Sequence, residues 1–595
     1  MAALPRSRLR LGFATGAVLL AAADTYVVVL ALPAIMRDVG ISLDHLEAAT
    51  PIVSGFLLGY VVVLPLLGRL SDMYGRVPVL LGCLAVFAAG SLTTASAHEL
   101  GVAVAGRALQ GLGGGGMVPV TLALVADMWP PERRGLPLGV VGAVQEFGSV
   151  IGPLYGAAIL TVSTWQTIFW INLPLCALLA LGLSVSRERA ARPATAVAAQ
   201  RPRRDWVGVF LMGVAVAAGG LAVVAPASLV GNDVAGSAYA PIAGVSWLSP
   251  LFLTAACAAV AFITWEARAP SAIRPLVSVR RLLGVLSSVD WLGAVLLGVS
   301  LAAVVVSFST ADPSRQVISP PALWLLPTAA LTLVLFVVRE SRAHDPLVEL
   351  PAFVSAPAVG ALLSNLAIGA ALMSALVDIP ILARVTVFPD SQLGAASELL
   401  RLLAAVPVGA VAGGWLSQRI GNRATASLGF CVVAAMFAVM TRWSPTTLSD
   451  PLGAGWLHAS DPVLVAAGLG FGLAIAPINA AILGAVRASL HGLASALVVV
   501  ARMVGMLVGI SVLTAVGLRT FFATEAGLPS PQALCPRTPL NCATYNNLVT
   551  AAVVDELRVV FLGASLCAGV AALSAALLLR GRPPREPARQ ALLVS

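Results

Sequence analysis

The sequence predicts an all-α polytopic membrane protein, in which two six-helix bundles are separated by inserted helices. Of its 595 residues, 59% are hydrophobic and 11% are charged, whereas a soluble protein carries about 25% charged residues. Apolar stretches long enough to cross a bilayer, about 20 residues each, follow one another along the chain. Patterns in the first third return in the last third, which indicates a duplicated fold.

Sixteen apolar spans are predicted, although their boundaries are approximate. The N-terminal stretch continues past Asp24 to Ile35, so we interpret it as an uncleaved first helix and not as a signal peptide. In chain order the spans are 11–35, 48–67, 78–97, 100–126, 137–161, 167–185, 207–228, 249–265, 286–308, 321–338, 356–382, 398–417, 424–441, 463–486, 493–517 and 557–579.

Arginine residues set the orientation, because cytoplasmic loops of membrane proteins carry the basic excess. They gather in the N-terminal tail, in alternate loops and in the C-terminal tail, so both termini are predicted to be cytoplasmic. The protein is expected in the inner (plasma) membrane. The Arg-rich loops alternate with loops that are nearly free of Arg, which is not the pattern of a nucleic-acid-binding protein.

Internal repeats define the expected domains. Gly68–Gly75 (GRLSDMYG) follows the second span, and Gly414–Gly421 (GWLSQRIG) follows the twelfth. The middle region contains a second repeat, in which Asp205-Trp-Val-Gly and Asp290-Trp-Leu-Gly each begin a helical pair. We therefore expect an N-terminal bundle over residues 1–185, a linker with a duplicated helical hairpin over 186–355, and a C-terminal bundle with a cytoplasmic tail over 356–595.

The fifth span carries two unusual features. Glu146 lies near its centre, where a charge costs about 2.5–3.5 kcal/mol on insertion scales. Gly148, Gly152 and Gly156 recur every four residues, with Pro153 beside them, so they form a smooth seam for another helix. This combination suggests a moving membrane protein with a functional carboxyl group.

Three intramembrane charges lead to a coupling hypothesis. Asp24 lies in the first span, Glu146 in the fifth, and Arg502 in the counterpart of the fifth span in the second half. We expect the two carboxyls to take up protons outside and release them inside, with Arg502 as their fixed positive partner. The alternative is a static buried ion pair that orders the bundle.

Further residues are candidates for less specific roles. Asp378 and Arg401 are expected at a gate or rim, and Gln145 and Tyr26 as polar groups of a cavity. Cys535 and Cys542 share a polar loop that topology places outside, so a disulfide is expected there. The five His residues fall in loops or span ends, and neither a metal-ligand spacing nor an ATP-binding loop is found.

Several motifs resemble the major facilitator superfamily. Gly68–Arg76 (GRLSDMYGR) resembles its signature cytoplasmic loop, in which the arginine pairs with an acidic residue at the end of the fourth helix, here Asp127. The resemblance gives Gly68, Asp72, Gly75 and Arg76 a part in conformational switching. Arg107-Ala-Leu-Gln-Gly-Leu-Gly resembles the second motif, whose arginine is tied to proton coupling, and Gly148–Gly156 (GSVIGPLYG) resembles the antiporter motif, which points to export.

The combination Asp24-Thr-Tyr-Val-Val-Val with Gln145–Tyr155 is similar to one subgroup of the drug:proton antiporter-2 branch. This subgroup comprises mycobacterial triacylglyceride exporters that work with a periplasmic lipoprotein. The branch has fourteen spans, so fourteen is the alternative count.

The resemblance implies a proton-coupled exporter of lipids, driven by the proton gradient and without a cofactor, metal ion or nucleic acid. A multidrug efflux antiporter is the alternative, and a non-transporting sensor or scaffold is a third interpretation. An enzyme is not expected.

Overall fold

A computed structural model describes residues 4–39, 46–186, 203–224, 236–240, 249–268, 273–274, 290–309, 321–343, 346–389, 391–452, 457–535 and 542–580. Sixteen helices of 19 residues or more occur within these ranges, and each predicted span falls on one of them. Among these described helices, fourteen are long and apolar enough to cross a membrane. The chain forms two compact units. The first contains residues 1–187 and 293–595, and the second contains residues 188–292. The proposed three-part domain division stays a prediction.

The first half contains six long helices, α1 to α6. A helix pairs its backbone polar groups internally, as the bilayer core requires, and apolar side chains allow it to face lipid. Their bounds are α1 Leu4–Asp38, α2 Leu46–Tyr74, α3 Arg76–Ala95, α4 Leu100–Met128, α5 Gly135–Val162 and α6 Gln166–Val185, with a short 3-10 helix η1 at Pro131–Arg133.

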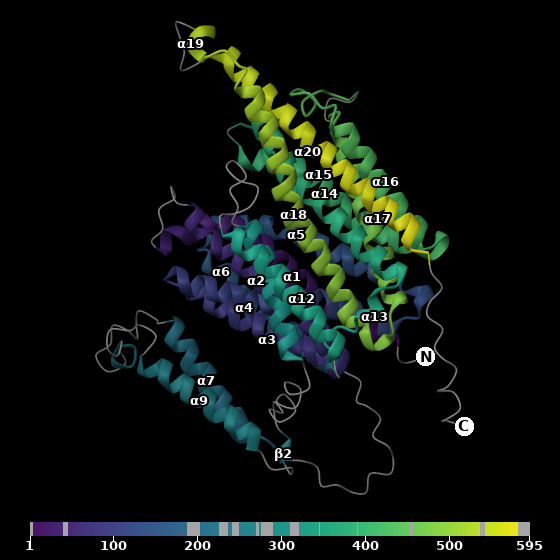
Figure 1. Ribbon diagram of the computed structural model, residues 1–595. Coiled ribbons are helices and arrows are strands. Elements are labelled where there is room, and N and C mark those ends of the chain that lie inside the picture. The colour runs from purple at the N-terminus through teal and green to yellow at the C-terminus, as the bar shows by residue number, and fades with distance from the viewer. Residues whose placement is uncertain are drawn as a thin grey trace. The chain divides into compact units, whose positions relative to one another are not determined.

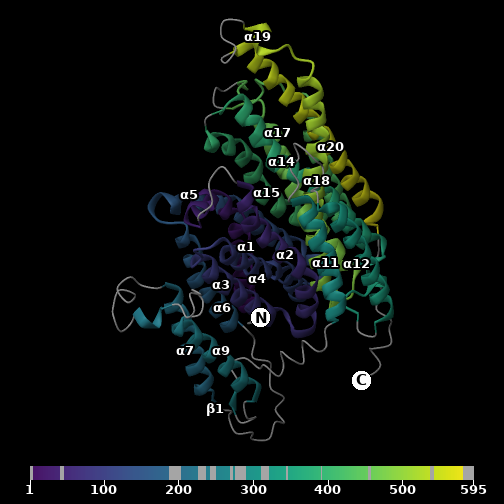
Figure 2. The ribbon, with the colours of Figure 1, turned by 60° about the vertical axis from the view of Figure 1, so that its left-hand side comes forward.

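The last half repeats this arrangement with six long helices. Its elements are α14 Ala356–Thr386, α15 Gln392–Ile420, α16 Asn422–Met440, α17 Asp461–Ala485, η3 Ala488–Leu490, α18 His491–Glu525, α19 Pro531–Leu534 and α20 Ala543–Leu578. The helices α18 and α20 lie side by side and lead to α19 (Figure 1, Figure 2).

The two halves use the same helix pairs for packing. α1 packs on α5, α2 on α4 and α3 on α6 in the first half, and α14 on α18, α15 on α17 and α16 on α20 in the second. The turns before α3 and α16 also match, because Gly75 and Gly421 adopt φ values of 88° and 85°. Only glycine adopts this left-handed region at no steric cost.

The middle elements form two helical hairpins. In residues 188–292, α7 (Trp206–Val224) packs on α9 (Pro250–Arg268), and Asp205 Oδ1 accepts hydrogen bonds from Gly208 N (2.8 Å) and Trp265 Nε1 (3.0 Å). In the other unit, Ser300 of α11 (Trp291–Ser309) donates to Ala329 O of α12 (Ala322–Arg342) at 3.0 Å. The remaining short elements are β1 Arg203–Arg204, η2 Gly236–Ala238, β2 Ile273–Arg274 and α13 Leu350–Phe353, and β1 pairs with β2 in parallel.

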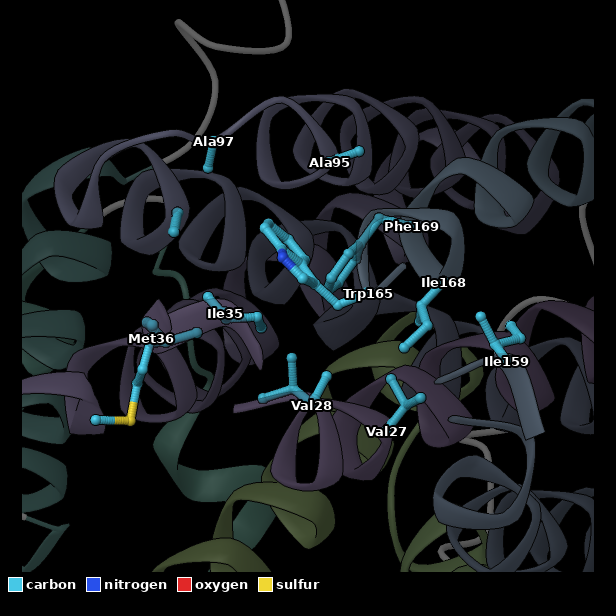
Figure 3. Close-up of a cluster of buried hydrophobic side chains, with 13 residues drawn as sticks. Val27, Val28, Ile35, Met36, Ala95, Ala97, Ile159, Trp165, Ile168 and Phe169 are labelled. Atoms are coloured by element: carbon cyan, nitrogen blue, oxygen red, sulfur yellow. The ribbon is translucent and has the colours of Figure 1, made fainter. Parts of the chain in front are cut away.

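A hydrophobic cluster joins all six helices of the first half, away from the loop between α2 and α3. Trp165 and Phe169 pack edge to face within it, beside Ile35 and Ile168 (Figure 3). The Trp165 indole donates to Asp38 Oδ2 at 2.7 Å, so its polar edge is satisfied. Burial of these side chains fixes the ends of the six helices relative to one another.

The glycine seam of α5 faces α1. A Cβ on Gly148 would lie 2.7 Å from Ala22 Cβ, and a Cβ on Gly152 would overlap the Ala23 carbonyl. Gly505 of α18 faces α14 in the same way, at the carbonyl of Leu366. These glycines therefore bring backbone against backbone, and α1 carries Asp24 close to α5.

Replacing Gly152 by leucine should force α5 away from α1. Overpacking of this kind costs about 1–3 kcal/mol, so the thermal unfolding midpoint in detergent should fall clearly. Gly82→Leu is the matched control, because a Cβ at Gly82 meets no atom within 4 Å. Equal midpoints for the two variants would show that the seam is not tightly packed.

Candidate functional site

A buried ion pair lies inside the first half. Asp24 on α1 is 3% exposed and Arg107 on α4 is 0% exposed, and Arg107 Nη1 lies 2.5 Å from Asp24 Oδ2. The guanidinium also lies over the Phe56 ring, 4.4 Å from its centroid. The arginine cannot lose its proton, so the carboxylate and the ring together stabilise its charge inside the apolar bundle.

Amide side chains complete this network. Asn172 on α6 donates to Asp24 Oδ1 at 2.8 Å, and Gln110 on α4 donates to both carboxylate oxygens at 3.3 Å. Gln110 also donates to Ser91 on α3 at 2.8 Å. Gln110 belongs to the motif that begins at Arg107, but no role was predicted for it or for Asn172; a polar residue in an apolar span is the signal that could have found them.

A second ion pair joins the two halves. Arg502 Nη2 on α18 lies 2.6 Å from Glu146 Oε1 on α5, and the Glu146 side chain is 8% exposed. Asp24 is therefore paired with Arg107 and Glu146 with Arg502, so each carboxylate has its own cationic partner. The pair with Arg502 couples two helices that belong to different bundles.

The halves also meet at one end, which we call the closed end and define by Gly68, Asp72, Gly135, Gly414 and Gly492. The first half contributes α2 and α5 to this contact, and the second half contributes α18 and α15. Gly68 packs on Gly492, and Gly414 packs on Gly135, with no room for a Cβ at either contact.

The predicted switch residues gather at the closed end. Arg76 Nη1 lies 2.5 Å from Asp72 Oδ1, and Arg76 Nε lies 2.8 Å from Asp127 Oδ2. Asp72 also accepts hydrogen bonds from the backbone amides of Gly492 (2.8 Å) and Leu493 (3.0 Å). A carboxylate is favourable at this position, because the amides at a helix N-terminus carry partial positive charge.

His491 is a member of this cluster that sequence reasoning missed. It begins α18, is 3% exposed, and its Nδ1 lies 3.9 Å from Asp127 Oδ1 across the interface between the halves. Nδ1 is buried without a hydrogen-bond partner. The sequence showed a histidine at a span end, but gave no sign that Asp127 lies opposite.

The other candidates lie elsewhere. Asp378 is 2% exposed and buried in α14, and its Oδ2 has no hydrogen-bond partner in the part of the chain that the structure describes. Arg401 forms ion pairs with Glu398 and with Asp461, the latter at 2.8 Å, and so joins α15 to α17.

Gln145 lines a pocket together with Glu146 and Arg502. The side chain of Tyr26 lies outside the described residues. Cys535 and Cys542 are joined by a disulfide, next to α19 and α20. Among the described residues, no group of His, Cys, Asp and Glu is arranged to hold a metal ion.

Comparison with known proteins places these features in a family context. Residues 14–274 match the Major Facilitator Superfamily. A triacylglyceride transporter of Mycolicibacterium smegmatis is 35% identical over 95% of this chain and 86% of its own length. A triacylglyceride transporter of Mycobacterium tuberculosis (strain ATCC 25618 / H37Rv) is 36% identical over 86% of this chain and 83% of its own length.

Solved structures show the same fold at low sequence identity. A proton:xylose symporter of the major facilitator superfamily has a TM-score of 0.51 at 12% identity, covering 96% of this chain and 95% of its own. The human organic anion transporter MFSD10 has a TM-score of 0.50 at 14% identity, and the match covers 94% of this chain and 99% of the transporter's chain.

Removing the charge of Asp72 should loosen the closed end. Hydrogen bonds to a charged group contribute about 1.5–3 kcal/mol. Asp72→Asn should therefore raise the fraction of molecules in which the closed end is open by about tenfold or more. The measurement is the labelling rate of a cysteine in a Ser495→Cys background, because Ser495 on α18 is 0% exposed. Glu132→Gln, an exposed carboxylate in η1, is the control. An unchanged rate would contradict the assignment.

Proposed function

The chain belongs to the major facilitator superfamily and is a transporter, and from this premise we propose that it exports lipids such as triacylglycerides, driven by protons. Its relatives named triacylglyceride transporters support the substrate class. The antiporter-like seam of α5 supports the direction of transport. We also propose that the closed end and both termini are cytoplasmic, so that this structure represents the outward-facing state.

The character of the cavity between the halves carries the proposal. Two pockets flank the Glu146–Arg502 pair, and the charged residues that line them are these two alone among the described residues. Most other lining residues are aliphatic or aromatic. An uncharged lipid suits a cavity whose charges neutralise each other, whereas a cationic drug would need a free carboxylate.

The proposed proton coupling depends on the ion pair between Glu146 and Arg502. In the outward-facing state, water that reaches Glu146 would deliver a proton, remove its negative charge and dissolve the link between α5 and α18. The halves could then rock, and the closed end would open once its contacts with Asp72 break. Release of the proton on the inside would restore the pair and the outward-facing state. The Asp24–Arg107 network would serve as a second proton site in the first half.

Two further parts of the proposal rest on resemblance. A multidrug efflux antiporter is the runner-up, because it would use the same seam and the same ion pairs. A periplasmic lipoprotein is proposed as a partner that receives the lipid outside, since the resembling subgroup of exporters works with one. A non-transporting sensor is disfavoured, because it would not require both buried ion pairs.

Substrate choice can be tested in vesicles that contain the purified protein and carry an imposed pH gradient. Triacylglyceride should move against its gradient, and a cationic dye should not, because the cavity offers the dye no unpaired carboxylate. Collapse of the pH gradient should stop the lipid movement. Uptake of the dye without movement of the lipid would favour multidrug efflux instead.

Coupling can be separated from stability with a paired substitution. Glu146→Gln removes the carboxylate that faces Arg502, which costs about 3–5 kcal/mol for a buried pair, and should abolish proton-driven transport. The double variant Glu146→Gln with Arg502→Gln should regain thermal stability but not transport. Asp24→Asn should also abolish proton-driven transport, whereas Asp38→Asn, at the end of α1, should retain it. Transport restored by the double variant would mean that the pair is only structural.

A further inference from the structure

Asp378 is a buried carboxyl group that the proposed transport cycle does not use. It lies on α14, is 2% exposed, and its Oδ2 has no hydrogen-bond partner among the described residues. Asp24 is paired with Arg107 and Glu146 with Arg502, whereas no cationic side chain of the described ranges acts on Asp378. A carboxylate buried in this way would be costly, so the group is stable here only with its proton bound.

The packing of α14 on α18 places Asp378 far from the closed end. Ala370 on α14 meets Gly509 on α18, and the two helices run parallel. Eight residues further along both helices, Asp378 lies level with Gly517. Gly517 is about 37 Å along α18 from the closed end, at about 1.5 Å per residue. Asp378 therefore lies near the end of the second half that we propose to face outside.

A second carboxyl group lies at the same level. Glu556 on α20 packs against α18, where a Cβ on Gly517 would lie 3.1 Å from Glu556 Cγ. Its side chain is half-buried, and its charge acts on Asp378. Because α14 packs on both α18 and α20, the two carboxyl groups share one three-helix contact. Two carboxyl groups that interact in this way resist ionising together, so the pair retains a proton.

The other charged groups around Asp378 are engaged elsewhere or exposed. On α20, Arg558 pairs with Asp555 at 2.7 Å and also donates to a backbone carbonyl just after α16. On α15, Arg401 is held by its ion pairs within α15 and with α17. The exposed arginines of α14 and α18 near this level are Arg384 and Arg519. The pair of carboxyl groups thus has no cation to replace its proton.

We propose that Asp378 and Glu556 form a third proton-binding site, which takes up protons from the outer solution. Glu556 accepts a proton from water and passes it to the ionised Asp378, which leaves Glu556 ionised and ready to accept the next proton. The second half would then carry a proton of its own, besides those proposed for Asp24 and Glu146. This inference extends the proposed function and rests on it for the direction of proton movement.

Infrared spectroscopy of the purified protein tests the site, because a carboxylic acid and a carboxylate absorb at different frequencies. At neutral pH the parent protein should show a carboxylic acid band that Asp378→Asn lacks, and the band should disappear reversibly as the pH is raised. Asp450→Asn, which removes an exposed carboxyl group outside the helices, is the control and should keep the band. Asp378→Ser serves if Asp378→Asn fails to fold.

The part of Glu556 is tested by the rate of this change after a pH jump. A positioned proton-transfer group contributes about a hundredfold or more, so Glu556→Gln should slow the change of the band by about that factor. Asp555→Asn is the matched control, because Asp555 is the preceding residue of α20 but is paired with Arg558. Equal rates in the two variants would contradict the part given to Glu556.

Transport in vesicles connects the site to coupling. Asp378→Asn should lose proton-driven lipid movement by about tenfold or more, but keep the slow equilibration of lipid without a pH gradient. A band that persists at every pH, or full proton-driven transport by Asp378→Asn, would overturn the proposal. A rise in the thermal midpoint with Na⁺ that Asp378→Asn removes would overturn it in favour of a metal cation.

The infrared measurement needs neither lipid nor a gradient, so it separates this inference from the proposed function. A titrating Asp378 band in a parent protein without proton-driven transport would support the proton site and refute the proposed coupling.

Discussion

The ion pair between Glu146 and Arg502 is the constraint on which the central part of the molecule depends. A single charge buried in this apolar environment would be costly, and the two residues remain stable there only together. They belong to α5 and α18, which lie in different halves. Each half therefore holds a charge whose stability depends on the other half. The relative position of the bundles is fixed by electrostatics at their centre, and glycine packing then brings the helix backbones close around it.

The packing of the two halves is nearly symmetric, but their charges are not. Equivalent helix pairs pack in each half, and Gly75 and Gly421 make equivalent turns. The network of Asp24, Arg107 and Gln110 is built within the first half, while Arg502 of the second half is paired across the interface. The duplicated helices thus give the two halves the same packing, and residues that differ between the halves provide the charged groups. The halves can move as similar bodies while responding differently to a proton.

Much of the fold could be predicted, because hydropathy reports burial in lipid directly. Each predicted span falls on a helix, the seam was recognisable from the spacing of its glycines, and the switch loop from its resemblance to a family motif. The helix ends were less accessible: α18 continues to Glu525 and α20 begins at Ala543, beyond the apolar stretches, because a helix does not need apolar residues outside the bilayer. Ion pairs between residues distant in the chain could not be predicted either. The sequence showed Asp24 and Arg107 as separate charges, and only the packing of α1 on α4 makes them a pair. The same holds for His491 and Asp127.

The two glycine contacts of the closed end differ in strength. At Gly68 and Gly492, the carboxylate of Asp72 reinforces the contact by accepting two backbone amides of α18. At Gly414 and Gly135, the residue equivalent to Asp72 is Gln418, which brings no charge to the start of α5. One side of the closed end carries a buried carboxylate, whereas the other side brings two helix backbones together at glycines. Loss of the Asp72 charge would therefore weaken the contact between α2 and α18 and leave the glycine contact between α5 and α15 in place.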